Sequence, residues 1–545
     1  MRSGKHVVLF TLVAMNFIEQ PAPEVTIEQG TLSGRISEDG LIFEYLGIPY
    51  ATTNEKARFK APLPPPTWKG IFKATDDFTA CPQNNFIVIR GTEDCLKINV
   101  FVPAFATKPL PVMVYVHGGA FFLGDGGKFF LGPKFLLKHD VILVTFNYRI
   151  GVLGFLCLDI EEAPGNAGLK DQLAALRWVK MNIKAFGGDI DNVTVFGVSA
   201  GATSVSLLIA SGKLDGLVKR AILQSGSALA HWAITRKPLW VANYVLKSLG
   251  YDTEDPYELY SILNSMTYKQ LAALPHDKPV EQYLDTQLIH LPCIEKPFPG
   301  TEAIITDYPY NLLKRNPTNI SIIHGTTDQE GLFFISYDTL DTINYRNGKY
   351  LMASDLLFKT NEEAAKVSKE IQYFYFLEES ISMKTAMNLS ELYKHLHFEM
   401  PSIFESQILA EASNVTVFNY YFKYSGNRNY LKFALGYDEI DGACHGDDLL
   451  YLFDAVLWPF KINKYDNLMI RRMTTMWTNF AKYGDPTPTT TKELQVRWLP
   501  SNKDNLRFLY IDSDFEMASM PSPEAYEMWK NIYQKYRKQS LDSDR

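Results

Sequence analysis

The stretch that decides the fold covers residues 192–208 and reads Asn-Val-Thr-Val-Phe-Gly-Val-Ser-Ala-Gly-Ala-Thr-Ser-Val-Ser-Leu-Leu. Its first residues form an apolar run typical of a buried strand, and its last residues are small enough for a closely packed helix. Gly197 and Gly201 flank the turn between them and let the backbone pack tightly, which would push the Oγ of Ser199 out of a sheet. The segment predicts a strand, a tight turn and a helix, with Ser199 as a candidate nucleophile. Residues 197–201, Gly-Val-Ser-Ala-Gly, are by themselves weak evidence for a catalytic serine.

Other apolar runs extend this pattern along the chain. They cover residues 112–116, 141–146, 220–223, 320–323 and 415–421. Short, continuously apolar runs suit strands that are covered on both faces, and residues 169–186 carry leucines and a valine at helical spacing between two of them. The alternation predicts an α/β fold with a large, mostly parallel central sheet flanked by helices. The stretches 251–316 and 350–412 are expected to be helical, loop-rich insertions around the site.

Composition places the chain among ordinary globular proteins. Its 545 residues are 46% hydrophobic and 21% charged, which is enough apolar material for a large core. No repeat, low-complexity stretch or linker divides the sequence, so residues 23–535 are predicted to form a single domain. The formal net charge is only −7 and the basic residues are dispersed, which gives no reason to expect nucleic acid as a partner.

The N-terminus has the pattern of a secretory signal peptide. Arg2 and Lys5 precede an apolar run at residues 7–17, and we expect a signal over residues 1–22 and a secreted protein. The alternative is a buried N-terminal segment of an intracellular protein. No later stretch has the roughly 18 uninterrupted apolar residues of a membrane span. Residues 536–545 are predicted to be a polar tail.

The five cysteines leave at least one unpaired. Cys81 and Cys95 lie close together among polar and turn residues, which suits a short loop closed by a disulfide in an oxidising compartment. Cys157, Cys293 and Cys444 have apolar or histidine-adjacent neighbours and are expected to be free thiols.

Four sequons are possible glycosylation sites. Asn192 and Asn319 begin strands that should be buried, where a glycan would not fit. Asn388 and Asn414 are therefore the better candidates.

A serine nucleophile needs donors for the developing oxyanion. Residues 117–122 read His-Gly-Gly-Ala-Phe-Phe and follow the apolar run at 112–116. Adjacent glycines can turn backbone N–H groups toward a negative charge without a side chain in the way, so Gly118, Gly119 and the N–H of Ala200 are the candidates. A plain glycine loop is the alternative.

The same nucleophile needs an acid and a base. Glu330 or Asp328 follows the apolar run at 320–323, where hydrolase sheets place a carboxylate. The histidines after this point are His395, His397 and His445. His445 lies in a glycine-flanked loop before an expected amphipathic helix at 447–453, whereas the other two lie within a helix-like stretch. The order serine, acid, histidine is that of α/β-hydrolases.

Several segments together resemble the type-B carboxylesterases of the cholinesterase and carboxylesterase family, and most of all those of insects. They are Gly47-Ile-Pro-Tyr-Ala51, Glu93-Asp-Cys-Leu-Lys-Ile-Asn-Val100, the His-Gly-Gly loop, Phe146-Asn-Tyr-Arg-Ile-Gly-Val-Leu-Gly-Phe155, Gly165-Asn-Ala-Gly-Leu-Lys-Asp-Gln172, the serine turn and Gln224-Ser-Gly-Ser227. The resemblance covers nearly the whole chain and implies the α/β-hydrolase fold around an active-site gorge.

The resemblance also implies roles for individual residues. It puts the nucleophile on Ser199, the acid on Glu330 rather than Asp328, the base on His445 and the oxyanion donors on Gly118, Gly119 and Ala200. The family's first disulfide falls on Cys81 with Cys95, and Ser225 matches a serine that supports the hydrogen bonding of the acid. Neither a metal nor an organic cofactor is needed, and no HExxH or CxxC pattern offers a metal site.

Departures from the family pattern narrow the expected substrate. Cholinesterases have glutamate at the position of Val198 and a tryptophan in the first disulfide loop, where this chain has none. An uncharged, fairly hydrophobic carboxylic ester is therefore expected, as in xenobiotic, odorant or pheromone breakdown. Candidate pocket residues are Val198, Phe121, Phe122, Trp232, Phe333 and Phe334, each of which has core packing as its alternative.

Two other interpretations stay open at this point. Juvenile hormone esterases typically have glutamine where this chain has Val198, which disfavours that activity without excluding it. A non-catalytic adhesion protein of the neuroligin and neurotactin kind would usually lack one of the three catalytic residues. The sequence leaves the oligomeric state open.

Overall fold

The structure is a computed structural model, and it describes residues 20–85, 88–412, 415–455 and 461–539. Most of the predicted signal peptide and the sequon at Asn414 lie outside these residues. The chain enters the fold at a strand that begins at Pro21, so the predicted boundary at residue 22 falls inside that strand.

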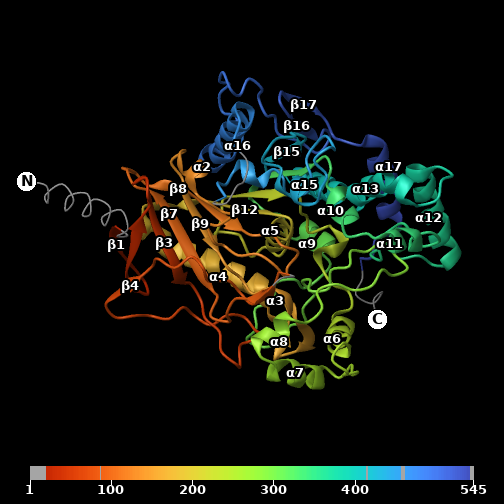
Figure 1. Cartoon of the computed structure of the whole chain (residues 1–545), viewed down its shortest axis with the longest axis horizontal. Coiled ribbons are helices and arrows are strands. Elements are labelled where there is room, and N and C mark those ends of the chain that lie inside the picture. The colour runs from red at the N-terminus through yellow and green to blue at the C-terminus, as the bar shows by residue number, and fades with distance from the viewer. Residues whose placement is uncertain (1–19, 86–87, 413–414, 456–460, 540–545) are drawn as a thin grey trace, which may run out of the picture.

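A large twisted sheet runs through the centre of the molecule (Figure 1). Its strands, in spatial order, are β1 (Pro21–Ile27), β2 (Gly30–Ile36), β3 (Ile42–Pro49), β7 (Lys97–Pro103), β9 (Ile142–Phe146), β8 (Leu110–Val116), β12 (Gly188–Val198), β13 (Arg220–Gln224), β14 (Ser321–Thr327), β15 (Val417–Phe422), β16 (Arg507–Ile511) and β17 (Phe515–Ser519), while β4 (Ile71–Lys73) pairs with β2. The strands from β9 to β16 are parallel, and the strands outside them pair antiparallel along the main path. The prediction of a mostly parallel sheet is confirmed.

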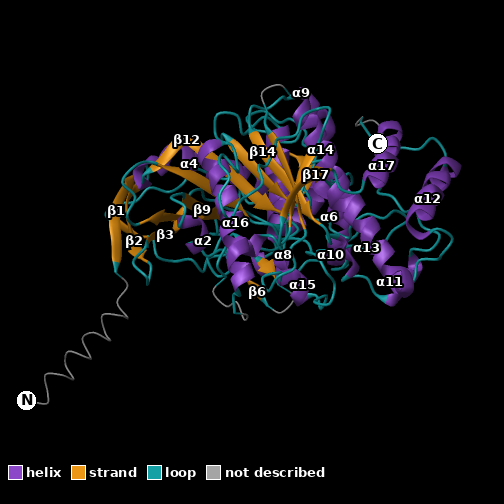
Figure 2. Ribbon diagram, turned by 90° about the horizontal axis from the view of Figure 1, so that it is seen from above, coloured by secondary structure: helices purple, strands orange, loops and turns teal. Residues whose placement is uncertain are grey.

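Helices cover both faces of this sheet and gather at one end of it (Figure 2). They are α2 (Lys134–Leu137), α3 (Gly151–Phe155), α4 (Ala167–Asn182), α5 (Ala200–Ala210), α6 (Pro238–Lys247), α7 (Pro256–Ser265), α8 (Tyr268–Ala272), α9 (Pro309–Arg315), α10 (Gly331–Ile335), α11 (Leu340–Tyr345), α12 (Asn361–Phe376), α13 (Ala386–Lys394), α14 (Met400–Glu411), α15 (Tyr430–Ala434), α16 (Lys464–Tyr483) and α17 (Pro523–Tyr536). A π-helical segment, His395–Glu399, joins α13 to α14. Two small sheets, β5 (Gln83–Asn84) with β6 (Ile89–Arg90) and β10 (Cys157–Ile160) with β11 (Ala163–Pro164), lie apart from the main one.

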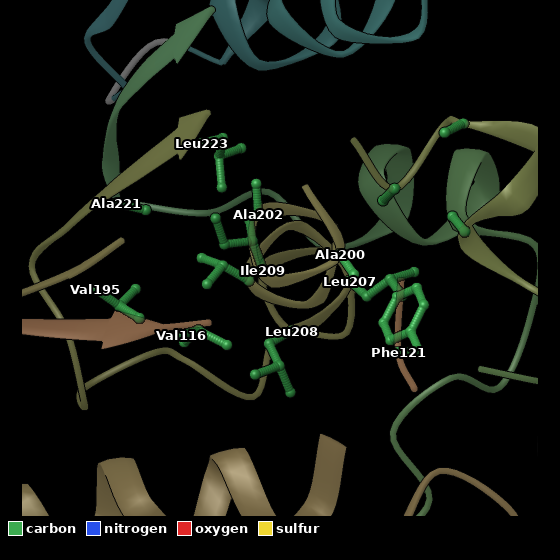
Figure 3. Close-up of a cluster of buried hydrophobic side chains, with 14 of the residues drawn as sticks. Val116, Phe121, Val195, Ala200, Ala202, Leu207, Leu208, Ile209, Ala221 and Leu223 are labelled. Carbon is green, nitrogen blue, oxygen red and sulfur yellow. The ribbon is translucent and has the colours of Figure 1, made fainter. Parts of the chain in front are cut away.

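Alternate residues of the central strands enter two different cores. Val112, Val114 and Val116 of β8 belong to one hydrophobic cluster, whereas Met113 and Tyr115 belong to another. On the first side, α5 packs against β12 and β13, as Figure 3 shows for Ala202 and Ile209 beside Val195 and Ala221. Burial on both faces explains why these strands read as continuously apolar runs.

Two disulfides are present where one was predicted. Cys81 is bonded to Cys95 as expected, but Cys157 is bonded to Cys293, so the expectation that both are free thiols is wrong. An apolar neighbourhood does not distinguish a buried disulfide from a buried thiol, and the partners lie 136 residues apart. Cys444 is a buried free cysteine, as predicted.

Three smaller expectations also change. The amphipathic helix expected at 447–453 is only a short 3-10 turn at Leu449–Tyr451. Asp447 points inward there and accepts the backbone N–H groups of Leu431 and Cys444. Asn319 is exposed rather than buried. The first residues of the predicted tail belong to the fold, since α17 continues to Tyr536 and the N–H of Lys538 bonds the carbonyl of Asp355.

No helix within the described parts of the chain is long and apolar enough to cross a membrane.

Asn388, one of the two candidate glycosylation sites, is exposed on α13, and its side-chain amide donates to the carbonyl of Tyr375.

Candidate active site

The serine turn joins the carboxyl end of β12 directly to α5. Ser199 has φ 57° and ψ −127°, a strained left-handed conformation for a residue with a side chain. A Cβ on Gly201 would lie 2.1 Å from the carbonyl oxygen of Val116, and a Cβ on Gly197 would lie 2.7 Å from the carbonyl carbon of Gly201. Only glycine fits at these two positions, so the sequence pattern has a steric cause.

Glu330 and His445 are brought together by the loops that follow β14 and precede Leu449. The Nδ1 atom of His445 lies 2.6 Å from Oε2 of Glu330, and both side chains are buried. The second carboxylate oxygen of Glu330 accepts the backbone N–H of Thr327 at 2.9 Å. The carboxylate therefore holds the proton on Nδ1 and leaves a lone pair on Nε2. That Nε2 is buried and has no hydrogen-bond partner among the described residues.

Asp328, the other carboxylate considered, joins these two loops instead of contacting the histidine ring. Its Oδ1 accepts the backbone N–H of Ala443 at 2.7 Å, and the N–H of Gln329 donates to the carbonyl of Ala443 at 2.9 Å. Burial raises the pKa of Asp328 to about 7. His395 bonds to Tyr375, and His397 bonds to His231. Neither of them is hydrogen-bonded to Glu330.

The glycine loop after β8 lies against the serine turn. A Cβ on Gly118 would lie 3.2 Å from the Cβ of Ser199, and Gly119 has φ +106°, where a Cβ would meet the carbonyl of Leu123 at 2.2 Å. The ring of His117 stacks on Tyr148 at 4.2 Å, and its Nδ1 bonds the carbonyl of Gly118 at 2.8 Å. The backbone N–H groups of Gly118 and Gly119 make no hydrogen bond within the described residues, so they are available to an anion.

The predicted supporting role of Ser225 does not appear in the structure. Its backbone N–H donates to the carbonyl of Gly325 at 2.8 Å, and its φ is +55°. Its Oγ is buried without a hydrogen-bond partner among the described residues. The backbone N–H of Thr327, rather than this hydroxyl, satisfies the acid.

Aromatic rings surround His445. Phe333 and Phe398 lie 4.9 and 4.4 Å from the imidazole centroid, while Phe334 and Trp232 contact Phe398 at 5.6 and 5.9 Å. We call Trp232, Phe333, Phe334 and Phe398 the aromatic cluster. Three of the four were predicted from sequence. Phe398 was missed because it lies in a helix-like stretch without any local signal, in a segment that the structure shows to be π-helical.

The other predicted pocket residues lie around this cluster in different ways. Val198 is buried at the end of β12, and a Cβ on Gly446 would lie 3.7 Å from it. Phe121 is fully buried, with Phe155 at 5.0 Å and Trp232 at 6.5 Å, so it packs in the core. Phe122 stacks on His276 at 4.7 Å.

A buried carboxyl group supports the helix that begins at the serine turn. Glu405 of α14 is fully buried, its Oε1 accepts from the Oγ of Ser206 on α5, and its Oε2 has no hydrogen-bond partner among the described residues. Burial raises the pKa of Glu405 from 4.5 to about 7. The folded state therefore keeps this proton over a pH range in which the unfolded chain has lost it.

This difference predicts how stability depends on pH. Since the folded state binds more protons than the unfolded state between pH 4.5 and about 7, stability falls as the pH rises through this window. Glu405→Gln removes that titration, so its free energy of unfolding relative to the natural chain should rise by roughly 3 kcal/mol across the window. Denaturant unfolding of both proteins at each end of the window measures the difference, and parallel pH profiles would contradict it.

Comparison with known proteins identifies the family of this chain. Residues 21–529 match the model of the carboxylesterase family. Esterase FE4 of Myzus persicae is 33% identical over 523 residues, covering 90% of this chain and 89% of that protein. Juvenile hormone esterase of Heliothis virescens is 33% identical over 499 residues, covering 86% of each.

A solved structure agrees with these relatives. The crystal structure of juvenile hormone esterase from Manduca sexta, with OTFP covalently attached, superimposes with a TM-score of 0.82 at 28% identity, covering 94% of this chain and all of that one. The mostly parallel sheet with flanking helices is thus an α/β-hydrolase fold, and ester hydrolysis is the activity that the relatives support. The chain belongs to the carboxylesterase family.

Proposed function

We propose that this protein hydrolyses carboxylic esters through an acyl-enzyme on Ser199. The observation that carries the proposal is the 2.6 Å contact between His445 Nδ1 and Glu330 Oε2, with Nε2 left unpaired. A neutral imidazole in this tautomer is a general base for a serine hydroxyl. The strained turn at Ser199 supplies the hydroxyl at the end of a central strand.

The proposed reaction has two halves. His445 Nε2 takes the proton of Ser199 as Oγ bonds to the ester carbonyl carbon, and the N–H groups of Gly118, Gly119 and Ala200 stabilise the oxyanion. The imidazolium, which Glu330 stabilises, gives its proton to the alkoxide as the carbon–oxygen bond breaks and the alcohol leaves. Water then loses a proton to His445 and attacks the acyl group, and Ser199 regains the proton as the carboxylic acid departs.

The aromatic cluster and Val198 support an uncharged, fairly hydrophobic substrate. The four aromatic side chains and the valine offer apolar surface next to His445 and the serine turn. No tryptophan lies in the loop between Cys81 and Cys95 to receive a quaternary ammonium group. We therefore propose a carboxylesterase with a preference for neutral esters, and not a cholinesterase.

Covalent capture tests the nucleophile directly. A reactive organophosphate should inhibit the enzyme with one phosphoryl group per chain, because the activated hydroxyl attacks phosphorus as it attacks a carbonyl carbon. Mass spectrometry should find the increment on the peptide that contains Ser199, in proportion to the lost activity. Loss of activity with the increment on another peptide would contradict the proposal.

A second candidate is hydrolysis of juvenile hormone. Its support is the TM-score of 0.82 with the Manduca sexta enzyme and the 33% identity with that of Heliothis virescens. We expect a higher kcat/KM for short-chain naphthyl and nitrophenyl esters than for juvenile hormone, because Val198 replaces the glutamine typical of those enzymes. Measurement of kcat/KM on this panel decides between the two, and the opposite ranking would favour the hormone.

We also propose that the protein is secreted. Two disulfides within the described residues suit an oxidising compartment, and the sequence of residues 1–22 agrees with a signal peptide. N-terminal sequencing of protein recovered from the medium of expressing cells would test this, with a start near Pro23 as the expected result.

A further inference from the structure

Two buried histidines and a partly buried aspartate lie in a row beside the aromatic cluster. Oδ1 of Asp285 is 3.6 Å from Nδ1 of His231, and Nε2 of His231 is 2.7 Å from Nδ1 of His397. The two histidines are 4% and 2% exposed. Burial lowers the pKa of both rings well below the usual value, so both imidazoles are neutral. The mechanism proposed above uses none of these three residues.

The carboxylate, whose Oδ1 also accepts the backbone N–H of Ser354, favours one arrangement of the protons on the two histidines. Two neutral imidazoles 2.7 Å apart share one N–H, and the negative charge of Asp285 favours a proton on Nδ1 of His231. Nε2 of His231 is then the acceptor, and Nδ1 of His397 donates to it. The nitrogen that keeps a free lone pair is then Nε2 of His397. That nitrogen has no hydrogen-bond partner among the described residues.

The π-helical segment places this lone pair next to the aromatic cluster. Consecutive residues of a regular helix point in different directions, yet His397 and Phe398 both contact Phe334, at 4.7 and 5.6 Å. The indole N–H of Trp232 donates to the carbonyl of His397 at 3.0 Å, which holds the segment against the cluster. Phe334 contacts both His397 and Phe398, and Phe398 contacts His445, so ring contacts connect the two histidines.

We infer that Nε2 of His397 accepts a hydrogen bond from the substrate. It makes the enzyme selective for esters that carry a hydroxyl group on the otherwise apolar chain lying against the aromatic cluster. An apolar wall alone disfavours a buried hydroxyl, because the group loses its hydrogen bonds to water, and one aligned acceptor offsets that loss. This inference rests on the proposed function, since it concerns the substrate of the same site.

Matched esters test the inference. Two series of nitrophenyl esters, in which straight acyl chains of increasing length end in a hydroxyl or in a methyl group, are compared by kcat/KM. Two further series carry the same ends on the alcohol side. His397→Phe, which keeps a ring but removes the acceptor, should lower the ratio of hydroxyl-ended to methyl-ended ester by about tenfold at one chain length in at least one pair of series. His397→Gln, whose amide oxygen is an acceptor, should restore most of the ratio.

Two more variants separate recognition from general damage. Asp285→Asn removes the charge that orients the protons, so it should lower the same ratio without touching the substrate. His139→Phe replaces a partly buried histidine that bonds to Thr474 and has no contact with Asp285, His231 or His397. This variant should leave the ratio unchanged. A ratio that is the same in all proteins overturns the inference, as does an equal fall in His139→Phe. Hydrolysis of the methyl-ended esters in those experiments shows that the proposed function stands even when the inference fails.

Discussion

Ser199→Ala is expected to lower kcat/KM for short-chain naphthyl esters by roughly 10⁵-fold or more, because the acyl-enzyme cannot form without the hydroxyl. The oxyanion donors and the binding surface would remain, so any residual rate comes from these alone. Steady-state kinetics with a sensitive naphthyl ester measures the loss. Because alanine fits the serine turn as closely as serine does, the unfolding transition should stay close to that of the natural chain.

Ser211→Ala provides the matched control. Ser211 follows the far end of the same helix, where its Oγ donates to the carbonyl of Leu208. Its activity should equal that of the natural chain. Full activity in Ser199→Ala, or an equal loss in the control, would refute the assignment.

Substitution of His445 tests whether this histidine and Ser199 act as a unit. His445→Ala should lose about as much activity as Ser199→Ala, and the double variant should lose little more than either single one, because the base has no function without the hydroxyl. Losses that multiply in the double variant would mean that the two residues act independently.

The parts of the site that follow from local sequence were predictable. The serine turn is defined by steric limits at Gly197 and Gly201, and Glu330 follows a strand whose apolar run is continuous. The choice of His445 over His395 and His397 followed from its glycine-flanked loop, and only this histidine bonds Glu330. These features depend on residues that are neighbours in the sequence, so a single sequence is enough to predict them.

The parts that depend on distant packing were not predictable. Phe398 contacts His445 from a segment that is π-helical at His395–Glu399, whereas the sequence there reads as an ordinary helix. Cys157 and Cys293 meet across 136 residues. Asp447 looked like the start of an amphipathic helix but is turned inward by the N–H groups of Leu431 and Cys444. In each case a long-range contact overrides the local pattern.

Gly201→Ala is expected to have a large structural effect at the serine turn. The added Cβ would lie 2.1 Å from the carbonyl oxygen of Val116, on a central strand that cannot move without breaking its pairing with β12. Overpacking of this kind should lower the free energy of unfolding by roughly 3 kcal/mol or more. The serine turn would shift with α5, so esterase activity should fall as well. Thermal unfolding and naphthyl ester kinetics measure the two effects.

Gly201 lies in α5 without a positive φ, so steric contact alone should account for the cost of its substitution. A glycine with a left-handed φ in open space gives the size of a backbone effect for comparison. Gly300→Ala is the control, because Gly300 has φ +75° but a Cβ there would meet no atom within 4 Å. The left-handed conformation alone should cost about 1 to 2 kcal/mol, without loss of activity. If Gly201→Ala were no more destabilising than Gly300→Ala, the close approach of β8 to α5 would not be what requires glycine at this position. A larger loss confined to Gly201→Ala means that steric contact with Val116 fixes the second glycine of the serine turn.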